Sequence, residues 1–155
     1  MYWTPNTQKN AQINVVPKTG LIKKKGLLLI DDDEFFRALF QAIADSLDVP
    51  AETYASLAEL PSFAALREYD VAILDYYLES FKGPEIAEYV DVFFKDLPCL
   101  VISGGEIHDY DRRTWPACIR RFVPKSSGPY AIIERGLEVL TGSAAMPTRR
   151  AVNLN

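Results

Sequence analysis

Charged and hydroxyl side chains follow short apolar runs at several points in this sequence. Asp31 and Asp32 follow the first run, Asp75 follows another, and Ser103 and Lys125 follow two more. Taken singly, each has an ordinary structural explanation as a turn residue after a strand. Their recurrence at four such positions indicates one shared site, because the carboxyl ends of parallel strands line the crevice where open α/β sheets bind ligands.

These residue types have the chemistry of phosphoryl transfer. Three carboxylates close together repel one another, so without a cation at least one of them has a raised pKa. Clustered carboxylate oxygens suit Mg²⁺, which keeps several waters and takes few protein ligands. Beside such a metal one carboxylate can accept a phosphoryl group, while the Lys125 ammonium and the Ser103 hydroxyl stabilise its oxygens. Gly104 and Gly105 would leave room for the incoming donor.

The elements that must position these residues are buried strands. Short apolar runs are typical of strands covered on both faces in a parallel sheet. One run is weaker than the rest and is expected near the sheet edge. The predicted strands are residues 27–30, 51–54, 71–74, 98–102 and 121–124.

Helical periodicity separates the strands. An apolar stripe at helical spacing follows Asp33, which we expect to cap the first helix. Ser56 is expected to cap a second helix, which Pro61 interrupts. Proline suits the first turn of a helix, so the third helix should begin at Gly83-Pro84. The predicted helices are residues 35–47, 56–66, 83–94, a short or irregular one within 106–117, and 130–140, which Ser126 or Ser127 caps and in which Ile132, Ile133, Leu137 and Leu140 form the buried stripe.

This alternation of strands and helices predicts an α/β fold with a five-stranded parallel sheet and helices on both faces. Right-handed crossovers reduce the choices to doubly wound sheets. We expect the flavodoxin-like strand order 2-1-3-4-5, because it sets the first and third strands side by side at the switch point. Asp31, Asp32 and Asp75 then become neighbours, with Ser103 and Lys125 on adjoining strand ends.

Length and composition indicate one soluble globular domain. The chain has 155 residues, of which 48% are apolar and 25% charged. No apolar run approaches the roughly 20 residues of a membrane span, and residues 1–6 lack the layout of a signal peptide. Cys99 and Cys118 resemble neither a disulfide framework nor a metal site, which favours the cytoplasm. The expected organisation is a flexible arm at 1–25, one domain at 26–140 and a tail or linker at 141–155.

Charge divides the chain into an acidic body and basic ends. Residues 27–140 hold all 21 acidic residues and ten of the 17 basic ones, a net charge of −11. A body of this charge repels nucleic acid, so no direct nucleic-acid binding is expected. The basic ends would contact an acidic partner or keep flexible segments in solution.

Four stretches carry a resemblance to a known family. They are Leu29-Ile30-Asp31-Asp32-Asp33, Tyr69-Asp70-Val71-Ala72-Ile73-Leu74-Asp75 with Gly83 eight residues further on, Val101-Ile102-Ser103-Gly104, and Arg121-Phe122-Val123-Pro124-Lys125-Ser126. Each stretch is weak alone, but together they are specific. The chain resembles, over roughly residues 26–140, the CheY-like receiver domain of bacterial two-component response regulators.

The resemblance implies a signalling switch and not an ordinary enzyme. It implies that Asp75 accepts a phosphoryl group from a sensor histidine kinase or a histidine phosphotransfer protein. It also implies a Mg²⁺ ion held by Asp31, Asp32, Asp75 and the backbone carbonyl of Tyr77.

The same resemblance assigns the residues that respond to the phosphate. Ser103 stands at the switch position, Lys125 is the phosphate-sensing lysine, and Phe122 is the rotating aromatic. Phosphorylation would then reshape the face made by the fourth helix, the fifth strand and the last helix. A downstream protein would read that face. Association of the chain into a homodimer is a separate expectation.

The chain departs from the family pattern at four positions. Glu79 stands where proline is frequent, and Tyr77 is bulky enough to crowd the water that would hydrolyse the acyl phosphate. Phe122 has no hydroxyl, so only its packing can change. Ser126 replaces a frequent proline, in a form similar to receivers that carry helix-turn-helix output domains. The 15 residues after Leu140 are too few for such a domain, so the sequence represents a stand-alone receiver or a fragment of a longer regulator.

Two other functions fit part of the pattern. Asp31-x-Asp33 after an apolar strand, with a later serine and lysine, is similar to haloacid-dehalogenase-type phosphohydrolases, in which Asp31 would be the nucleophile and Asp33 the acid/base. That function leaves Asp75 without a role. The other alternative is a receiver-like module that binds proteins without being phosphorylated. The presence of all five site residues argues against it, while the departures at Tyr77, Glu79 and Ser126 leave it open.

Overall fold

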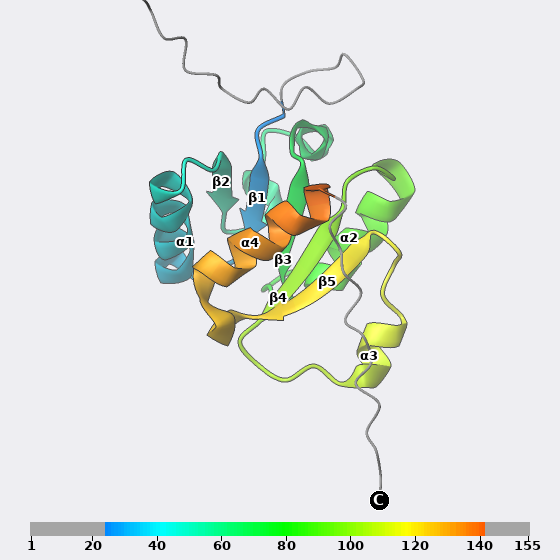
Figure 1. Cartoon of the computed structure of the whole chain (residues 1–155). Coiled ribbons are helices and arrows are strands. Elements are labelled where there is room, and N and C mark those ends of the chain that lie inside the picture. Colours follow the sequence, from blue (N-terminus) through cyan, green and yellow to red (C-terminus); the bar gives the residue numbers. More distant parts are fainter. Residues whose placement is uncertain (1–23, 142–155) are drawn as a thin grey trace, which may run out of the picture.

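Five parallel strands form the centre of the protein, shown in Figure 1 as a computed structural model that describes residues 24–141. The strand order is β2-β1-β3-β4-β5, which confirms the predicted doubly wound sheet. The strands are β1 (Leu27–Ile30), β2 (Ala51–Tyr54), β3 (Val71–Asp75), β4 (Cys99–Ser103) and β5 (Ile119–Pro124). The weak strand β2 lies at one edge, as predicted, and β5 lies at the other.

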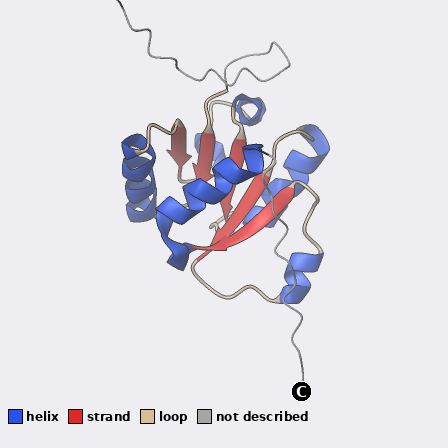
Figure 2. Ribbon diagram, in the orientation of Figure 1, coloured by secondary structure: helices blue, strands red, loops and turns tan. Residues whose placement is uncertain are grey.

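Helices cover both faces of this sheet (Figure 2). The α-helices are α1 (Glu34–Ser46), α2 (Gly83–Phe93), α3 (Asp109–Arg113) and α4 (Gly128–Thr141), and the 3-10 turns are η1 (Leu57–Glu59), η2 (Phe63–Glu68) and η3 (Lys125–Ser127). Helices α1 and α4 pack together on one face, whereas η2 and α2 cover the other. None of the helices between residues 24 and 141 is both long and apolar enough to cross a membrane.

The core divides into two clusters because successive strand side chains point to opposite faces of the sheet. Leu28 and Ile30 of β1 face η2 and α2, while Leu27 and Leu29 face α1 and α4. All four leucine and isoleucine side chains of β1 are fully buried. Burial on both faces explains why β1, β3 and β4 appear in the sequence as continuous apolar runs.

The predicted second helix at 56–66 is wrong. The structure has two 3-10 turns there, and Ser56 makes no side-chain capping hydrogen bond. The break falls at Leu60, whose extended backbone (φ −65°, ψ 145°) is the conformation that a following proline imposes. Pro61 therefore separates two short 3-10 turns and does not lie within one helix.

The predicted buried stripe of the last helix is half wrong. Ile132 and Ile133 are fully buried, but Leu137 and Leu140 are 37% and 43% exposed. Gly136 is buried instead, and a Cβ atom built on it would lie 3.4 Å from Leu27 Cδ2. The helix therefore meets the sheet closely at Gly136, which turns its last leucines outward.

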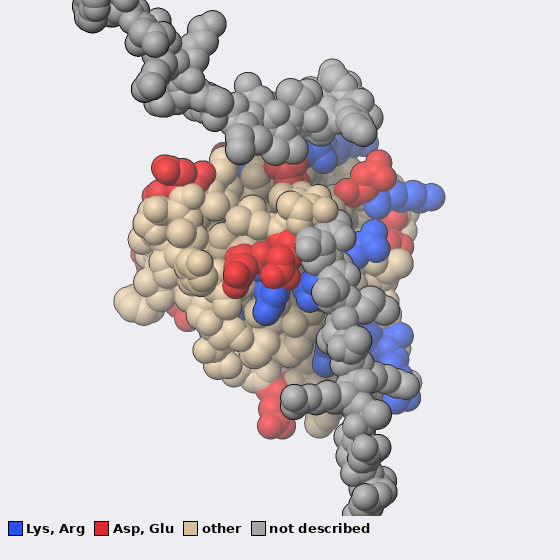
Figure 3. Space-filling model, in the orientation of Figure 1, with Lys and Arg blue, Asp and Glu red and all other residues tan. Residues whose placement is uncertain are grey.

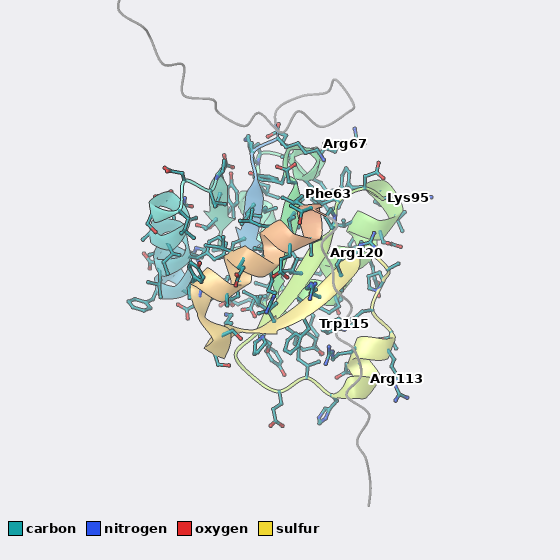
Figure 4. All side chains as sticks on the ribbon, in the orientation of Figure 1. Phe63, Arg67, Lys95, Arg113, Trp115 and Arg120 are labelled. Carbon is teal, nitrogen blue, oxygen red and sulfur yellow. The ribbon has the colours of Figure 1, made fainter. Side chains whose placement is uncertain are left out.

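The β5 edge of the sheet is irregular and basic. The register between β4 and β5 shifts at the start of the pair, since Cys99 pairs with Ile119 and Leu100 with Arg121, which leaves Arg120 as the extra residue. Lys and Arg side chains gather along this side of the molecule (Figure 3), where Arg113 and Arg120 are labelled in Figure 4. The strand ends in a proline.

The predicted arm at 1–25 and tail at 141–155 fall almost wholly outside the described residues. Contacts with the body are already present at Lys25, whose ammonium lies 2.8 Å from Glu68 Oε2. The backbone N–H of Lys25 also donates to the Glu68 carbonyl at 2.6 Å. The body therefore holds the chain from Lys25 onward.

Candidate functional site

The sheet brings the sequence-predicted residues to one edge. Asp31 follows β1 directly, Asp75 and Ser103 are the last residues of β3 and β4, and Lys125 follows β5. One carboxylate oxygen from each of Asp31, Asp32 and Asp75 lies within 4.8 Å of the others. Asp31 and Asp75 are buried, while Asp32 is exposed.

Lys125 joins the two buried carboxylates. Its ammonium donates a hydrogen bond to Asp75 Oδ2 at 3.0 Å and lies 2.7 Å from Asp31 Oδ2. Burial alone would lower the pKa of Lys125, but its contacts with the two carboxylates outweigh burial, so its pKa is raised. The lysine is therefore fully charged at neutral pH and partly offsets the two buried negative charges.

Asp75 remains electrostatically unfavourable despite this lysine. Burial raises its pKa above the ordinary value of 3.8, and the negative charge of Asp31 adds to that effect. The hydrogen bond from Lys125 and the backbone N–H of Tyr77, 3.4 Å from Asp75 Oδ1, act in the opposite direction without cancelling it. The folded protein thus holds a carboxylate that would gain from a further cation.

The donor set fits a divalent cation of the magnesium type. Asp31 Oδ2 is buried and accepts no hydrogen bond within residues 24–141, since the approach of Lys125 is an ion pair without hydrogen-bond geometry. The other Asp31 oxygen accepts the N–H of Asp33 at 2.9 Å. Mg²⁺ prefers oxygen ligands. This site offers three carboxylates, one of which has a buried oxygen that accepts no hydrogen bond.

The loop that follows β3 returns to pack against the backbone of Asp75 and Tyr76. The N–H of Gly83 donates to the carbonyl of Tyr76 at 3.2 Å. A Cβ atom on Gly83 would lie 2.5 Å from the Asp75 carbonyl oxygen, so no other residue fits without a backbone shift. Tyr77 itself is 53% exposed, and its ring lies edge-on to Tyr76 at 4.7 Å between centroids.

Ser103 is buried at the same edge of the sheet, and its hydroxyl group is available as a hydrogen-bond donor. Its Oγ accepts the N–H of Gly105 at 3.1 Å, and within the described chain its own O–H donates to no side chain or carbonyl. Gly104 and Gly105 follow it with ordinary packing, because Cβ atoms there would meet Lys125 Cδ at 3.9 Å and Tyr77 Cε2 at 3.5 Å, both van der Waals distances. The structure thus places a free donor and a small-residue loop next to Asp75.

The aromatic residue predicted to respond to Ser103 lies in a stack of side chains. Phe122 is half-buried on β5 and contacts Trp115 edge-on at 6.2 Å. The Arg112 guanidinium lies 5.1 Å from the Phe122 centroid and 6.0 Å from that of Trp115. A change in the packing of Phe122 would therefore alter the contacts of Trp115 and of Arg112 in α3.

Two residues of the site carry no recognisable signal in the sequence. The ring of Phe36 lies 4.9 Å from the Lys125 ammonium, and Arg37 donates to the Asp31 carbonyl at 2.7 Å. Phe36 was indistinguishable from the core residues of its apolar stripe, and no motif marks Arg37. The signal that could have found both is their position in the first turn of α1, directly above the first strand end.

The geometry does not favour the phosphohydrolase alternative. Asp33, which would be its acid/base, caps α1 by accepting the N–H of Phe36 at 3.0 Å. Asp75, which that alternative leaves without a role, is instead hydrogen-bonded to Lys125 inside the cluster.

Comparisons with known proteins agree on the fold. The receiver domain protein (CheY-like) of Methanospirillum hungatei JF-1 is 19% identical, with a TM-score of 0.66 over 77% of this chain and 96% of that one. The response regulator TrrA of Thermotoga maritima, solved in complex with Mg(2+)-BeF, is 22% identical, with a TM-score of 0.63 over 75% and 98%. DrrB of Thermotoga maritima, an OmpR/PhoB homolog, is 14% identical, with a TM-score of 0.64 over 78% of this chain and 54% of DrrB.

Sequence comparison gives the family. No curated protein matches the chain. The profile of the response regulator receiver domain, in contrast, matches residues 27–136, which include every strand and the whole carboxylate cluster. The chain therefore belongs to the response regulator receiver domain family.

Proposed function

We propose that this receiver domain is a phospho-accepting switch in which Asp75 takes a phosphoryl group from a sensor histidine kinase or a histidine phosphotransfer protein. The observation that carries the proposal is the cluster at the carboxyl edge of the sheet, in which the half-buried Lys125 joins the buried carboxylates of Asp31 and Asp75. Structural ion pairs of this kind are uncommon in a core, because desolvating the charges costs more than ordinary packing gains. Such a cluster beside Asp32, Ser103 and two glycines supports a chemical role.

The chain's own residues account for the transfer. A carboxylate oxygen of Asp75 attacks phosphorus in line, and the bond from phosphorus to the donor nitrogen breaks as the acyl phosphate forms. Lys125 stays within reach of the transferred group and neutralises part of its charge. The free hydroxyl of Ser103 donates a hydrogen bond to one phosphoryl oxygen.

Asp31, Asp32, Asp75 and the carbonyl of Tyr77 are the ligands that would hold Mg²⁺. The ion, when bound, would neutralise charge that develops on the phosphoryl oxygens. The buried Asp31 and the exposed Asp32 then differ in role, since the first is fixed by the N–H of Asp33 and the second is open to solvent.

The conformational switch begins with a movement of the Ser103 side chain. Movement of its hydroxyl toward the phosphate vacates space that Phe122 can fill, and the stack with Trp115 changes with it. The face of α3, β5 and α4 then presents a different surface to a downstream protein or to a second copy. Phosphorylation shifts this equilibrium only by the contacts that differ between the two packings.

The test is intact-mass spectrometry after incubation with acetyl phosphate and Mg²⁺. We expect one added phosphoryl group, found on the peptide that contains Asp75 and lost on standing. Absence of both adduct and phosphate release would point to a binding module that works without phosphorylation. Continuous release of inorganic phosphate without an adduct on Asp75 would point to a hydrolase.

Replacing Ser103 by alanine is expected to uncouple phosphorylation from the switch. The variant should still gain one phosphoryl group, because Asp75 and Lys125 are unchanged. In a Trp3→Phe background Trp115 is the single tryptophan, so tryptophan emission reports the Phe122 stack. The emission should change on phosphorylation of the parent and stay constant in Ser103→Ala; an equal change in both proteins would remove Ser103 from the switch.

Magnesium is expected to stabilise the protein through the same cluster. A ligand at 100 times its Kd adds about 2.7 kcal/mol, which for a domain of this size raises Tm by roughly 10 °C. Asp32→Asn should lose most of that rise in a thermal melt. Asp33→Asn removes a charge from the same run but keeps an N-capping side chain, so it should respond like the parent. Equal responses of Asp32→Asn and Asp33→Asn would exclude Asp32 as a ligand.

A further inference from the structure

An apolar groove opens between η1, η2 and α2, on the face of the sheet opposite α1 and α4. Its volume is about 300 Å³, and no charged side chain lines it. The lining residues are Leu57, Phe63, Phe81, Ile86, Tyr89 and Phe93. The ring of Phe63 forms one wall and meets Tyr89 and Phe93 edge-on, at 6.1 Å and 6.2 Å between centroids.

The aromatic side chains of this groove are unusually exposed. Phe81, Tyr89 and Phe93 are 48%, 52% and 60% exposed, and Val92 beside them is 64% exposed. Scattered apolar residues are normal on a surface, but a contiguous patch of large rings marks a binding surface. Covering these rings would gain about 25 cal/mol for each Å² removed from water.

Two hollows continue the groove at its ends. One, of about 370 Å³, shares Leu57, Phe81 and Ile86 with the groove. It carries three carboxylates and no basic side chain, and these are Asp32, Glu59 and Glu79. The other, of about 260 Å³, shares Phe93 with the groove and includes Lys24 and Arg67. The three hollows together form a track from Lys24 to the edge of the Asp31, Asp32 and Asp75 cluster.

The chain enters its body at the basic end of this track. Lys25 is held to Glu68, the last residue of η2, by a backbone hydrogen bond and an ion pair. Phe63, Arg67 and Lys95 lie at the same end of the sheet as the start of β1 (Figure 4). Residues 1–23 therefore precede a point that lies next to the groove.

The sequence of residues 1–23 complements the track. The segment has three lysines and no acidic residue, so it matches the carboxylates of the far hollow. It also has three pairs of adjacent apolar residues for the groove, which are Tyr2-Trp3, Val15-Val16 and Leu21-Ile22. At roughly 3.3 Å for each extended residue, its 23 residues span up to about 76 Å.

We propose that residues 1–23 occupy this track in the same chain, with apolar side chains in the groove and lysines beside Asp32, Glu59 and Glu79. The tail at 142–155 suits the groove less well, because it follows Thr141 at the end of α4, on the other face of the sheet. The inference goes beyond the proposed switch and does not depend on phosphorylation.

The test is photo-cross-linking in the full chain. A benzoyl-phenylalanine is placed at Tyr89 in the groove, with the same substitution at Tyr130 of α4 as the matched control, since Tyr130 is similarly exposed at 57% on the opposite face. Irradiation at low protein concentration is followed by peptide mapping. We expect the Tyr89 probe to link to residues 1–23 within a species of monomer mass, and the Tyr130 probe not to link to them.

Three outcomes would overturn the proposal. They are a cross-link from Tyr89 to a second copy, a cross-link to residues 142–155, and a folded protein that gives no cross-link. If the Tyr89 variant does not fold, Phe93 serves as the probe position, because it is also in the groove and more exposed. Addition of Phe81→Ser, which removes another exposed ring of the groove, to the Phe93 probe should then reduce the yield.

Discussion

Replacing Asp75 by asparagine is expected to abolish the phosphoryl adduct completely. The amide cannot attack phosphorus as a carboxylate does, and the neighbouring Asp31 is fixed by Lys125 and by the N–H of Asp33. The measurement is intact mass after acetyl phosphate and Mg²⁺. Asp70→Asn is the matched control, because Asp70 precedes the other end of the same strand and should leave the adduct unchanged. An adduct of equal yield on Asp75→Asn would refute the assignment of the acceptor.

The same substitution is expected to stabilise the protein without Mg²⁺. Because the folded-state pKa of Asp75 is raised by burial first and by the charge of Asp31 second, its ionisation favours the unfolded state. This penalty is absent below the ordinary pKa of 3.8, grows as pH rises toward the folded value, and is then constant. Asparagine stays neutral throughout, so its urea midpoint should exceed that of the parent at pH 7 and match it near pH 3. If the stability of the parent instead increased relative to Asp75→Asn as the pH rises, ionisation of Asp75 would favour the folded state and the prediction would be wrong.

Replacing Gly83 by alanine is expected to damage both stability and phosphorylation. The new Cβ would lie 2.5 Å from the Asp75 carbonyl oxygen and 3.2 Å from Leu74 Cβ, neither of which belongs to a flexible side-chain end. Overpacking of this kind costs about 1–3 kcal/mol. Because the backbone that must move carries the acceptor, adduct formation should slow by roughly 10- to 100-fold. Urea unfolding and the time course of the adduct measure the two effects.

Gly104→Ala is the control for that substitution. Its Cβ would meet Lys125 Cδ at 3.9 Å, an ordinary van der Waals distance, although Gly104 lies in the same site. Stability should then change by less than about 0.5 kcal/mol, as for most exposed substitutions. Similar losses in both variants would show that glycine flexibility, and not the contact with Asp75, is what the site requires.

The sequence was sufficient for the sheet and for the meeting of the site residues. The strands of β1, β3 and β4 are buried on both faces, so their apolar runs had one simple interpretation, and parallel order then brought Asp31, Asp75, Ser103 and Lys125 to one edge. The pattern is strong because it depends on burial, which a sequence records directly.

What the sequence did not contain was the outcome of tertiary packing. Pro61 could interrupt a helix or divide it into two turns, and only the extended Leu60 decides between these. The exposure of Leu137 follows from the close approach of Gly136 to Leu27, a contact between distant parts of the chain. Phe36 beside Lys125 was hidden for the same reason, because a core phenylalanine and one facing an ammonium have the same spacing.

The irregular β5 edge bears on how copies of this protein can associate. An edge strand offers unpaired N–H and C=O groups on which a strand of another molecule can build a continuous intermolecular sheet. Here the extra residue Arg120 breaks the spacing of those groups, and Pro124 has no N–H to offer. Two adjacent positive charges, Arg120 and Arg121, would also repel their counterparts in a like strand. Self-association at this side of the domain should therefore proceed through side-chain surfaces, because the β5 edge resists the strand addition that leads to fibrils.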